Sequence, residues 1–240
     1  MEYFNEGSSA QEQNAAAQDV KDVSAETAEK KPRKKFFTAK SIAYFGILIA
    51  LELVLLIWGS AIPVGAGGAR LNFSLLPIVL GAILMGPVAG ALLGLVSGIA
   101  VLIMVVAGLQ GVFSVLFLEQ PVIISLICLL KTTLAGLGSG LLYRVIEKKS
   151  KKVGVFVASM ATPVINTGVF ILGCLCMTGA IEGWWFGEVG TMTSAFHIII
   201  FTFVGFNFLI EFAINLLLAP ALYSVIRVAE KRFSVRKKKS

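Results

Sequence analysis

The chain has 240 residues; 57% are hydrophobic, only 15% are charged, and the formal net charge is +7. Continuous apolar runs of about 20 residues are typical of membrane-spanning helices and argue against a β-barrel, whose strands alternate with a period of two. No P-loop, HExxH motif or nucleophile–base set occurs, so ATP hydrolysis by this chain alone is excluded and no enzyme activity is expected. We therefore predict an all-α integral membrane protein without a cofactor or a metal site.

Residues 1–35 are polar and carry few large apolar side chains, so we predict a disordered tail. The tail lacks the apolar core of a signal peptide and ends in the basic block KKPRKK, which is typical of a topology signal beside a membrane span. A six-helix membrane domain is expected over residues 36–229, followed by a second basic tail at 230–240. The helices are expected at about 37–59, 73–86, 87–107, 122–146, 153–177 and 194–228.

The sequence RLNFSLLPIVLGAILMGPVAGALLGLVSG, residues 70–98, is the predicted centre of the bundle. Pro87 can begin a helix but cannot continue one, so this stretch is expected to form two helices joined by a turn. The first helix would be roughly 14 residues long, about 21 Å, so a re-entrant hairpin and four spans stay an alternative to six. A glycine at every fourth position exposes backbone for close packing against another helix: Gly86, Gly90, Gly94 and Gly98.

Two further segments, GLQGVFSVLFLEQP and TGAIEGWWFGEVG, are interpreted as outer loops, the first with a short interfacial helix. All Lys and Arg residues except Arg70 and Lys131 lie in the N-terminal segment, between the fourth and fifth predicted helices, or at the C-terminus. The positive-inside rule then predicts that both termini face the cytoplasm. Cys128, Cys174 and Cys176 have no His or Cys partners at metal-ligand spacing and are interpreted as small helix residues.

Ionisable residues at membrane depth usually face a cavity or a partner. Glu52 and Lys131 are expected at similar depths, so they could form a structural pair between the first and fourth predicted helices or contact a bound solute. Asn166 is expected near the middle of the membrane. Three polar residues share one face of the sixth predicted helix, where interhelical hydrogen bonding or a partner contact is favoured over solute binding: Asn207, Glu211 and Asn215.

A polar outer mouth is the candidate solute site, together with the deeper residues Glu52, Lys131 and Asn166. The paired tryptophans could anchor the protein at the membrane interface or form a lid on a planar ligand. The single histidine could equally be a hydrogen-bonded interface residue. The mouth is expected to combine six residues: Arg70, Asn72, Gln120, Trp184, Trp185 and His197.

The FxxxP run that begins at Phe73, the GPxxG turn at Gly86 and the later stretch LLKTTLAGLGSGLLYRVIEKK follow one another in a fixed order. In this ordered set, residues 38–228 resemble the substrate-binding subunit of an energy-coupling factor (ECF) transporter. The resemblance implies a bacterial cell-membrane protein with a high-affinity site for a vitamin-type solute that opens outward. It also implies two kinds of partner, a membrane coupling subunit and two cytosolic ATPases.

In the family, small residues of the first helix pack against the coupling subunit. The matching positions here, which could instead pack inside the bundle, are Ala39, Ala43, Gly46 and Ala50. The resemblance does not identify the solute, so folate, pantothenate and riboflavin stay open. Arg70 and Lys131 would suit an anionic solute, and the two tryptophans a planar ring. The alternatives are a stand-alone secondary transporter with Glu52 or Glu211 as a proton relay, and a membrane scaffold.

Overall fold

A computed structural model describes residues 39–64, 69–70 and 72–237 of the chain. The predicted tail at 1–35 lies outside the described residues. Five described helices are long and apolar enough to cross a membrane, so the predicted all-helical, multi-pass architecture is confirmed at that level. They are Ser41–Ser60, Pro87–Val106, Pro121–Ile146, Lys151–Leu175 and Ala195–Val228.

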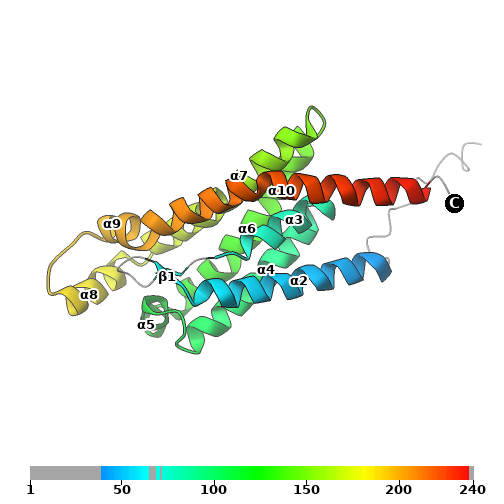
Figure 1. Ribbon diagram of the computed structural model, residues 1–240. Coiled ribbons are helices and arrows are strands. Elements are labelled where there is room, and N and C mark those ends of the chain that lie inside the picture. The colour runs from blue at the N-terminus through cyan, green and yellow to red at the C-terminus, as the bar shows by residue number, and fades with distance from the viewer. Residues whose placement is uncertain (1–38, 65–68, 71, 238–240) are drawn as a thin grey trace, which may run out of the picture. The chain divides into compact units, whose positions relative to one another are not determined.

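The helices run back and forth between two ends of the bundle (Figure 1). The first, α2, is followed by a short antiparallel strand pair, β1 and β2, in which Pro63 pairs with Arg70. The element bounds are α2 (Ala39–Ser60), β1 (Pro63–Val64), β2 (Ala69–Arg70), α3 (Leu75–Leu84), α4 (Pro87–Val106), α5 (Val112–Glu119), α6 (Pro121–Ile146), α7 (Lys151–Leu175), α8 (Thr178–Val189), α9 (Ala195–His197), the π-helix η1 (Ile198–Val204) and α10 (Gly205–Lys237).

Helix α3 has only 10 residues, about 15 Å at 1.5 Å per residue, half of the hydrocarbon thickness. Helix α3 begins at Leu75 and not at residue 73 as predicted, because the side chain of Asn72 binds the backbone of the residues that precede the helix. The amide of Ser74 donates to Asn72 Oδ1 at 3.2 Å, a local turn that competes with helix formation. The helix ends before Gly86, whose φ of 104° favours glycine. The count of six spanning helices is therefore not confirmed by helix length.

Helices α4 and α6 pack backbone against backbone. A Cβ atom added at Gly94 would overlap the carbonyl group of Thr132, and one added at Gly98 would lie 2.6 Å from the carbonyl oxygen of Cys128. The hydroxyl of Thr132 donates to the carbonyl oxygen of Gly94 at 2.6 Å, so a hydrogen bond accompanies the close approach. Gly90 faces the same helix. The glycine stripe thus identifies the helix pair around which the bundle is built.

The segment predicted as an outer loop with two tryptophans is helical, forming α8. It is held by the buried side chain of Ile181 and by Glu182, whose carboxylate accepts the backbone amide of Ala195 at 2.8 Å. The last predicted helix is also interrupted. In η1 the amide of Gly205 donates to the carbonyl oxygen of Ile200, a π-type bond across five residues.

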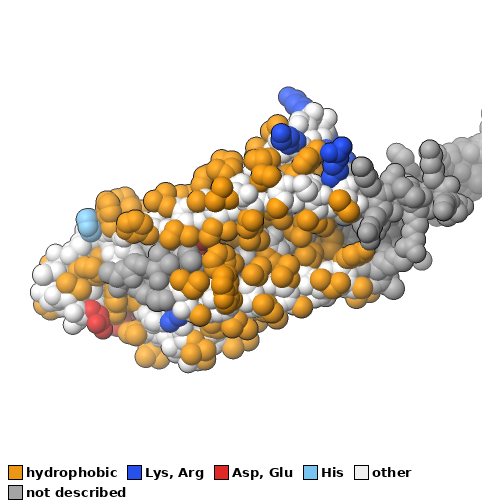
Figure 2. All heavy atoms as spheres, in the orientation of Figure 1, with side chains coloured by type: hydrophobic (Ala, Val, Ile, Leu, Met, Phe, Trp, Pro, Cys, Tyr) orange, Lys and Arg blue, Asp and Glu red, His pale blue; other side chains and the backbone are white. Residues whose placement is uncertain are grey.

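Hydrophobic side chains cover much of the visible surface of the described helices (Figure 2). Large apolar residues are exposed along several of them, among them Leu118 at 82% and Leu217 at 75%. Such a surface is unfavourable in water and favourable in lipid. Lys and Arg side chains gather instead at the end of the bundle where α6 joins α7 (Figure 2).

Candidate functional site

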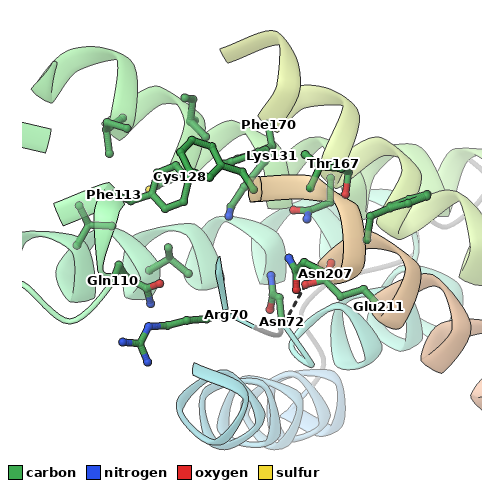
Figure 3. Close-up of a pocket in the computed structure, with 18 residues that line it drawn as sticks. Arg70, Asn72, Gln110, Phe113, Cys128, Lys131, Thr167, Phe170, Asn207 and Glu211 are labelled. Carbon is green, nitrogen blue, oxygen red and sulfur yellow. Dashed lines mark hydrogen bonds between the residues drawn. The ribbon is translucent and has the colours of Figure 1, made fainter. Parts of the chain in front are cut away.

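A pocket lies among α4, α6, α7, η1 and α10, and residues of β2 and α5 also line it (Figure 3). Its volume is about 80 Å³, room for a few water molecules. Side chains from every surrounding element contribute to its wall. The lining residues are Arg70, Asn72, Val101, Val105, Gln110, Phe113, Ile124, Ile127, Cys128, Lys131, Asn166, Thr167, Phe170, Phe203, Val204, Asn207, Phe208 and Glu211.

Lys131 projects from α6 into the pocket, with Asn72, Asn207 and Glu211 on the opposite side (Figure 3). Its ammonium group lies 5.6 Å from the centroid of the Phe170 ring, a cation–π contact. Within the described part of the chain no carboxylate lies within ion-pairing distance of this ammonium group. Lys131 therefore presents a positive charge to the pocket without a directly paired anion.

Glu211 ties the segment ahead of α3 to α10. Its Oε1 accepts the backbone amide of Asn72 at 2.9 Å, and its side chain is only 4% exposed. The side chain of Asn215, one turn further along α10, donates to the backbone carbonyl of Glu211 at 2.9 Å. This face of α10 thus combines a helix-packing role with a place in the pocket wall.

Arg70 occupies the rim of the pocket at the end of β2. One of its terminal nitrogens donates to the carbonyl oxygen of Ser60, the last residue of α2. The guanidinium group points away from Lys131 in Figure 3. Its Nε is buried and has no hydrogen-bond partner among the described residues. Arg70 thus joins the end of α2 to the pocket rim.

Two amide oxygens in the pocket lack donors. Both Asn166 Oδ1 and Asn207 Oδ1 are buried and have no hydrogen-bond partner in residues 39–64, 69–70 and 72–237. A buried acceptor without a donor is costly, so such atoms call for a ligand or ordered water. An aromatic cluster also lines the pocket, in which Phe113 meets Phe170 edge-on at 5.4 Å between centroids and Phe203 at 5.2 Å.

Of the residues proposed from the sequence, Arg70, Asn72, Lys131 and Asn166 meet in this pocket. Four other residues of the predicted mouth do not line this pocket. Gln120 caps the junction between α5 and α6. His197 is exposed and stacks on Phe201. Trp184 packs against Phe203 from outside, 5.9 Å between centroids, and Trp185 packs beside it.

The structural pair of Glu52 with Lys131, one of the two alternatives for these residues, does not form among the described residues. Glu52 is fully buried but does not line the pocket, and neither of its carboxylate oxygens has a hydrogen-bond partner among the described residues. Its polar neighbour is Ser97 on α4. The hydroxyl of Ser97 bonds to that of Ser74 at 2.8 Å, and Ser74 bonds to Asn72 Oδ1. A row of buried polar groups therefore leads from α2 to the pocket wall.

Several lining residues were not among the proposed solute contacts. The sequence places Asn207 and Glu211 on one face of the last helix, but their predicted role is helix packing or a partner contact. Phe170 lies one helical turn after Asn166 on α7, so the spacing of four residues could have identified Phe170 as a second residue on the pocket-facing side of that helix. Nothing in the sequence distinguishes Phe113 or Gln110 from other residues of the α5 region, because their place depends on how that segment folds back over α6.

The small residues of α2 face outward. Ala43, Gly46 and Ala50 are exposed, and a Cβ atom added at Gly46 would meet nothing within 4 Å. The side chain of Ala39 lies outside the described side chains. The alternative that these residues pack inside the bundle therefore does not hold for the three that are described.

Comparison with known families gives one result. The family model described as "ECF transporter, substrate-specific component" matches residues 40–223, which is well over half of the chain. A comparison with curated proteins finds no match.

Proposed function

The chain belongs to the family of substrate-specific components of ECF transporters, and we propose that it captures a water-soluble vitamin or a related small solute at the outer face of the bacterial cell membrane. The proposed solute site is the pocket among α4, α6, α7 and α10. Arg70, Asn72, Lys131 and Asn166 are the proposed contacts predicted from the sequence, and Asn207 and Glu211 join them.

The observation that carries this proposal is a set of unsatisfied buried polar groups inside an otherwise apolar bundle. Lys131 lacks a paired carboxylate, and Asn166 Oδ1 and Asn207 Oδ1 lack donors within the described residues. These groups are costly to maintain without a function, and a polar solute would satisfy them together. A vitamin-sized solute needs more than the present 80 Å³, since small-molecule sites usually measure about 300–1,000 Å³. Binding therefore requires the rim to open.

We propose that both termini and the loop between α6 and α7 face the cytoplasm. The bond from Arg70 to Ser60 places the start of the α3 segment beside the end of α2. At the other end of α3, Gly86 lies against the guanidinium group of Arg144 near the end of α6. The described residues between β2 and α3 would then complete a sixth crossing together with this short helix, and the pocket would open outward.

Uptake would depend on a membrane coupling subunit and two cytosolic ATPases, which supply the ATP hydrolysis. The outward-facing small residues of α2 support a close helix contact with the coupling subunit. The residues proposed for this contact are Ala43, Gly46 and Ala50, together with Ala39, which comes four residues before Ala43 in the sequence.

The test is a Gly46→Leu variant assayed with and without the partner subunits. Because a side chain at Gly46 meets nothing within this chain, solute binding by the isolated protein should equal that of the parent. Uptake by the full complex should fall at least tenfold, since a leucine would keep the coupling helix away. Loss of solute binding would instead place Gly46 in the solute site, and unchanged uptake would move the coupling contact elsewhere.

The buried carboxyl group of Glu52 favours one second candidate function, a stand-alone carrier driven by protons. Neither oxygen of this group is hydrogen-bonded among the described residues, and ionisable groups within membrane spans mark proton relays in pumps and transporters. Uptake by this chain alone, abolished by an uncoupler and by Glu52→Gln, would support the carrier. Uptake that requires the ATPases would support the transporter subunit.

A further inference from the structure

Resting on the proposed function, we propose that the solute is an organic anion that also carries an N–H or O–H donor, bound with its acid group at Lys131. The N–H or O–H group of the solute donates to the amide oxygens of Asn166 and Asn207, and the apolar part of the solute lies against Phe113 and Phe170. The pocket thereby selects among vitamin-sized solutes by charge.

The charge of the pocket wall favours an anionic solute. Two cationic side chains, Arg70 and Lys131, and a single carboxyl group, Glu211, line the pocket. The wall carries excess positive charge whether or not the Glu211 carboxyl holds a proton. Charge in a site enclosed by apolar helices is costly unless it is compensated. An anionic solute compensates it, whereas a neutral solute leaves it and a cationic solute increases it.

Of the two cations in the wall, Lys131 is the better placed to receive the acid group. Arg70 already donates to the carbonyl oxygen of Ser60 and points away from the pocket centre. Glu211 Oε1 already accepts the amide of Asn72. Lys131 forms no ion pair among the described residues; its ammonium group lies over the ring of Phe170 and reaches toward the centre of the pocket (Figure 3). This ammonium group is therefore the proposed partner for the acid group.

The hydrogen-bonding groups of the pocket wall require a donor on the solute. Asn166 Oδ1 and Asn207 Oδ1 are buried acceptors without donors in the described part of the chain. A solute with acceptors alone would leave both amide oxygens unsatisfied. The aromatic edge formed by Phe113 and Phe170 offers apolar contact but no hydrogen bond. The solute therefore needs an acid, a donor and an apolar part.

Four probes test this with the purified full chain, using the thermal unfolding midpoint and equilibrium binding. Pantothenate and pantothenol form a matched pair, because they differ by a carboxylate and a hydroxymethyl group; folate is a second anion and riboflavin a neutral vitamin. We expect stabilisation by pantothenate or folate and none by pantothenol or riboflavin. Lys131→Met should weaken binding of the effective anion about tenfold or more, and Lys131→Arg should retain most of it.

The unfolding midpoint without a probe reports whether each variant folds. If Lys131→Met does not fold, anion binding by the parent is compared with binding by Lys131→Arg and Asn166→Leu. Asn166→Leu should weaken binding of the same anion. Binding of riboflavin, or equal binding of pantothenol and pantothenate, overturns the anion assignment but leaves solute capture intact. No binding of any probe counts against the proposed capture function as well as the assignment.

Discussion

At the scale of single residues, Asn72 joins the parts of the pocket wall. Its backbone amide donates to Glu211 on α10, and its side chain accepts from the amide and hydroxyl of Ser74 ahead of α3. Ser74 in turn bonds to Ser97 on α4. Asn72 therefore closes the turn that precedes α3. It also connects this turn to α10 directly and to α4 through Ser74.

Two substitutions of Glu211 separate the effect of its charge from the effect of the hydrogen bond that it accepts from Asn72. Glu211→Leu leaves the buried amide of Asn72 without a partner, so we expect a loss of about 1–3 kcal/mol in unfolding free energy. Glu211→Gln retains an oxygen that can accept this amide and should lose less. Thermal unfolding in detergent measures both variants. Equal losses would show that the hydrogen bond from Asn72 contributes little.

Depth along the chain could be predicted from the sequence, but the direction of a side chain could not. The sequence predicts similar depths for Glu52 and Lys131, and depth alone suggests either a structural pair or a shared solute contact. In the structure Glu52 faces Ser97 and Lys131 faces the pocket. The missing information was the rotation of each helix about its axis, which is set by packing against neighbours that the sequence does not name.

At the scale of helices, the glycine stripe made the centre of the fold predictable. Small residues every fourth position need a partner backbone, and α4 indeed lies against α6. The interruption at η1 and the helix α8 were not predicted. Both depend on local hydrogen bonds, the bond from Gly205 to Ile200 and that from Ala195 to Glu182, and neither pairing leaves a spacing pattern in the sequence.

A matched pair of alanine substitutions tests this packing. In Gly94→Ala the new methyl group would overlap the backbone of Thr132, so we expect a loss of about 1–3 kcal/mol, as in other overpacked cores. In Gly46→Ala the methyl group meets nothing, and the change should be neutral or stabilising by up to about 1 kcal/mol because alanine favours helices. Thermal midpoints measure both. Equal midpoints would contradict the assigned α4–α6 contact.

At the scale of the whole molecule, the orientation in the membrane follows from the basic residues. In a cysteine-free background, a membrane-impermeant thiol reagent applied outside should label Gly183→Cys and leave Lys149→Cys unlabelled. Both positions are exposed, and a side chain at Gly183 meets nothing within 4 Å. Gly183 is preferable to Gly190, whose φ of 73° disfavours cysteine. Labelling of Lys149→Cys in sealed cells would invert the proposed orientation.

We propose that this chain captures a small solute in the pocket around Lys131. The most direct measurement is mass spectrometry of the small molecules released when the purified protein is denatured, compared between the parent and a folded Asn166→Leu variant. We predict one organic anion in near-stoichiometric amount with the parent and at least tenfold less with the variant. The same molecule retained equally by both proteins, or none retained by the parent, would contradict the account.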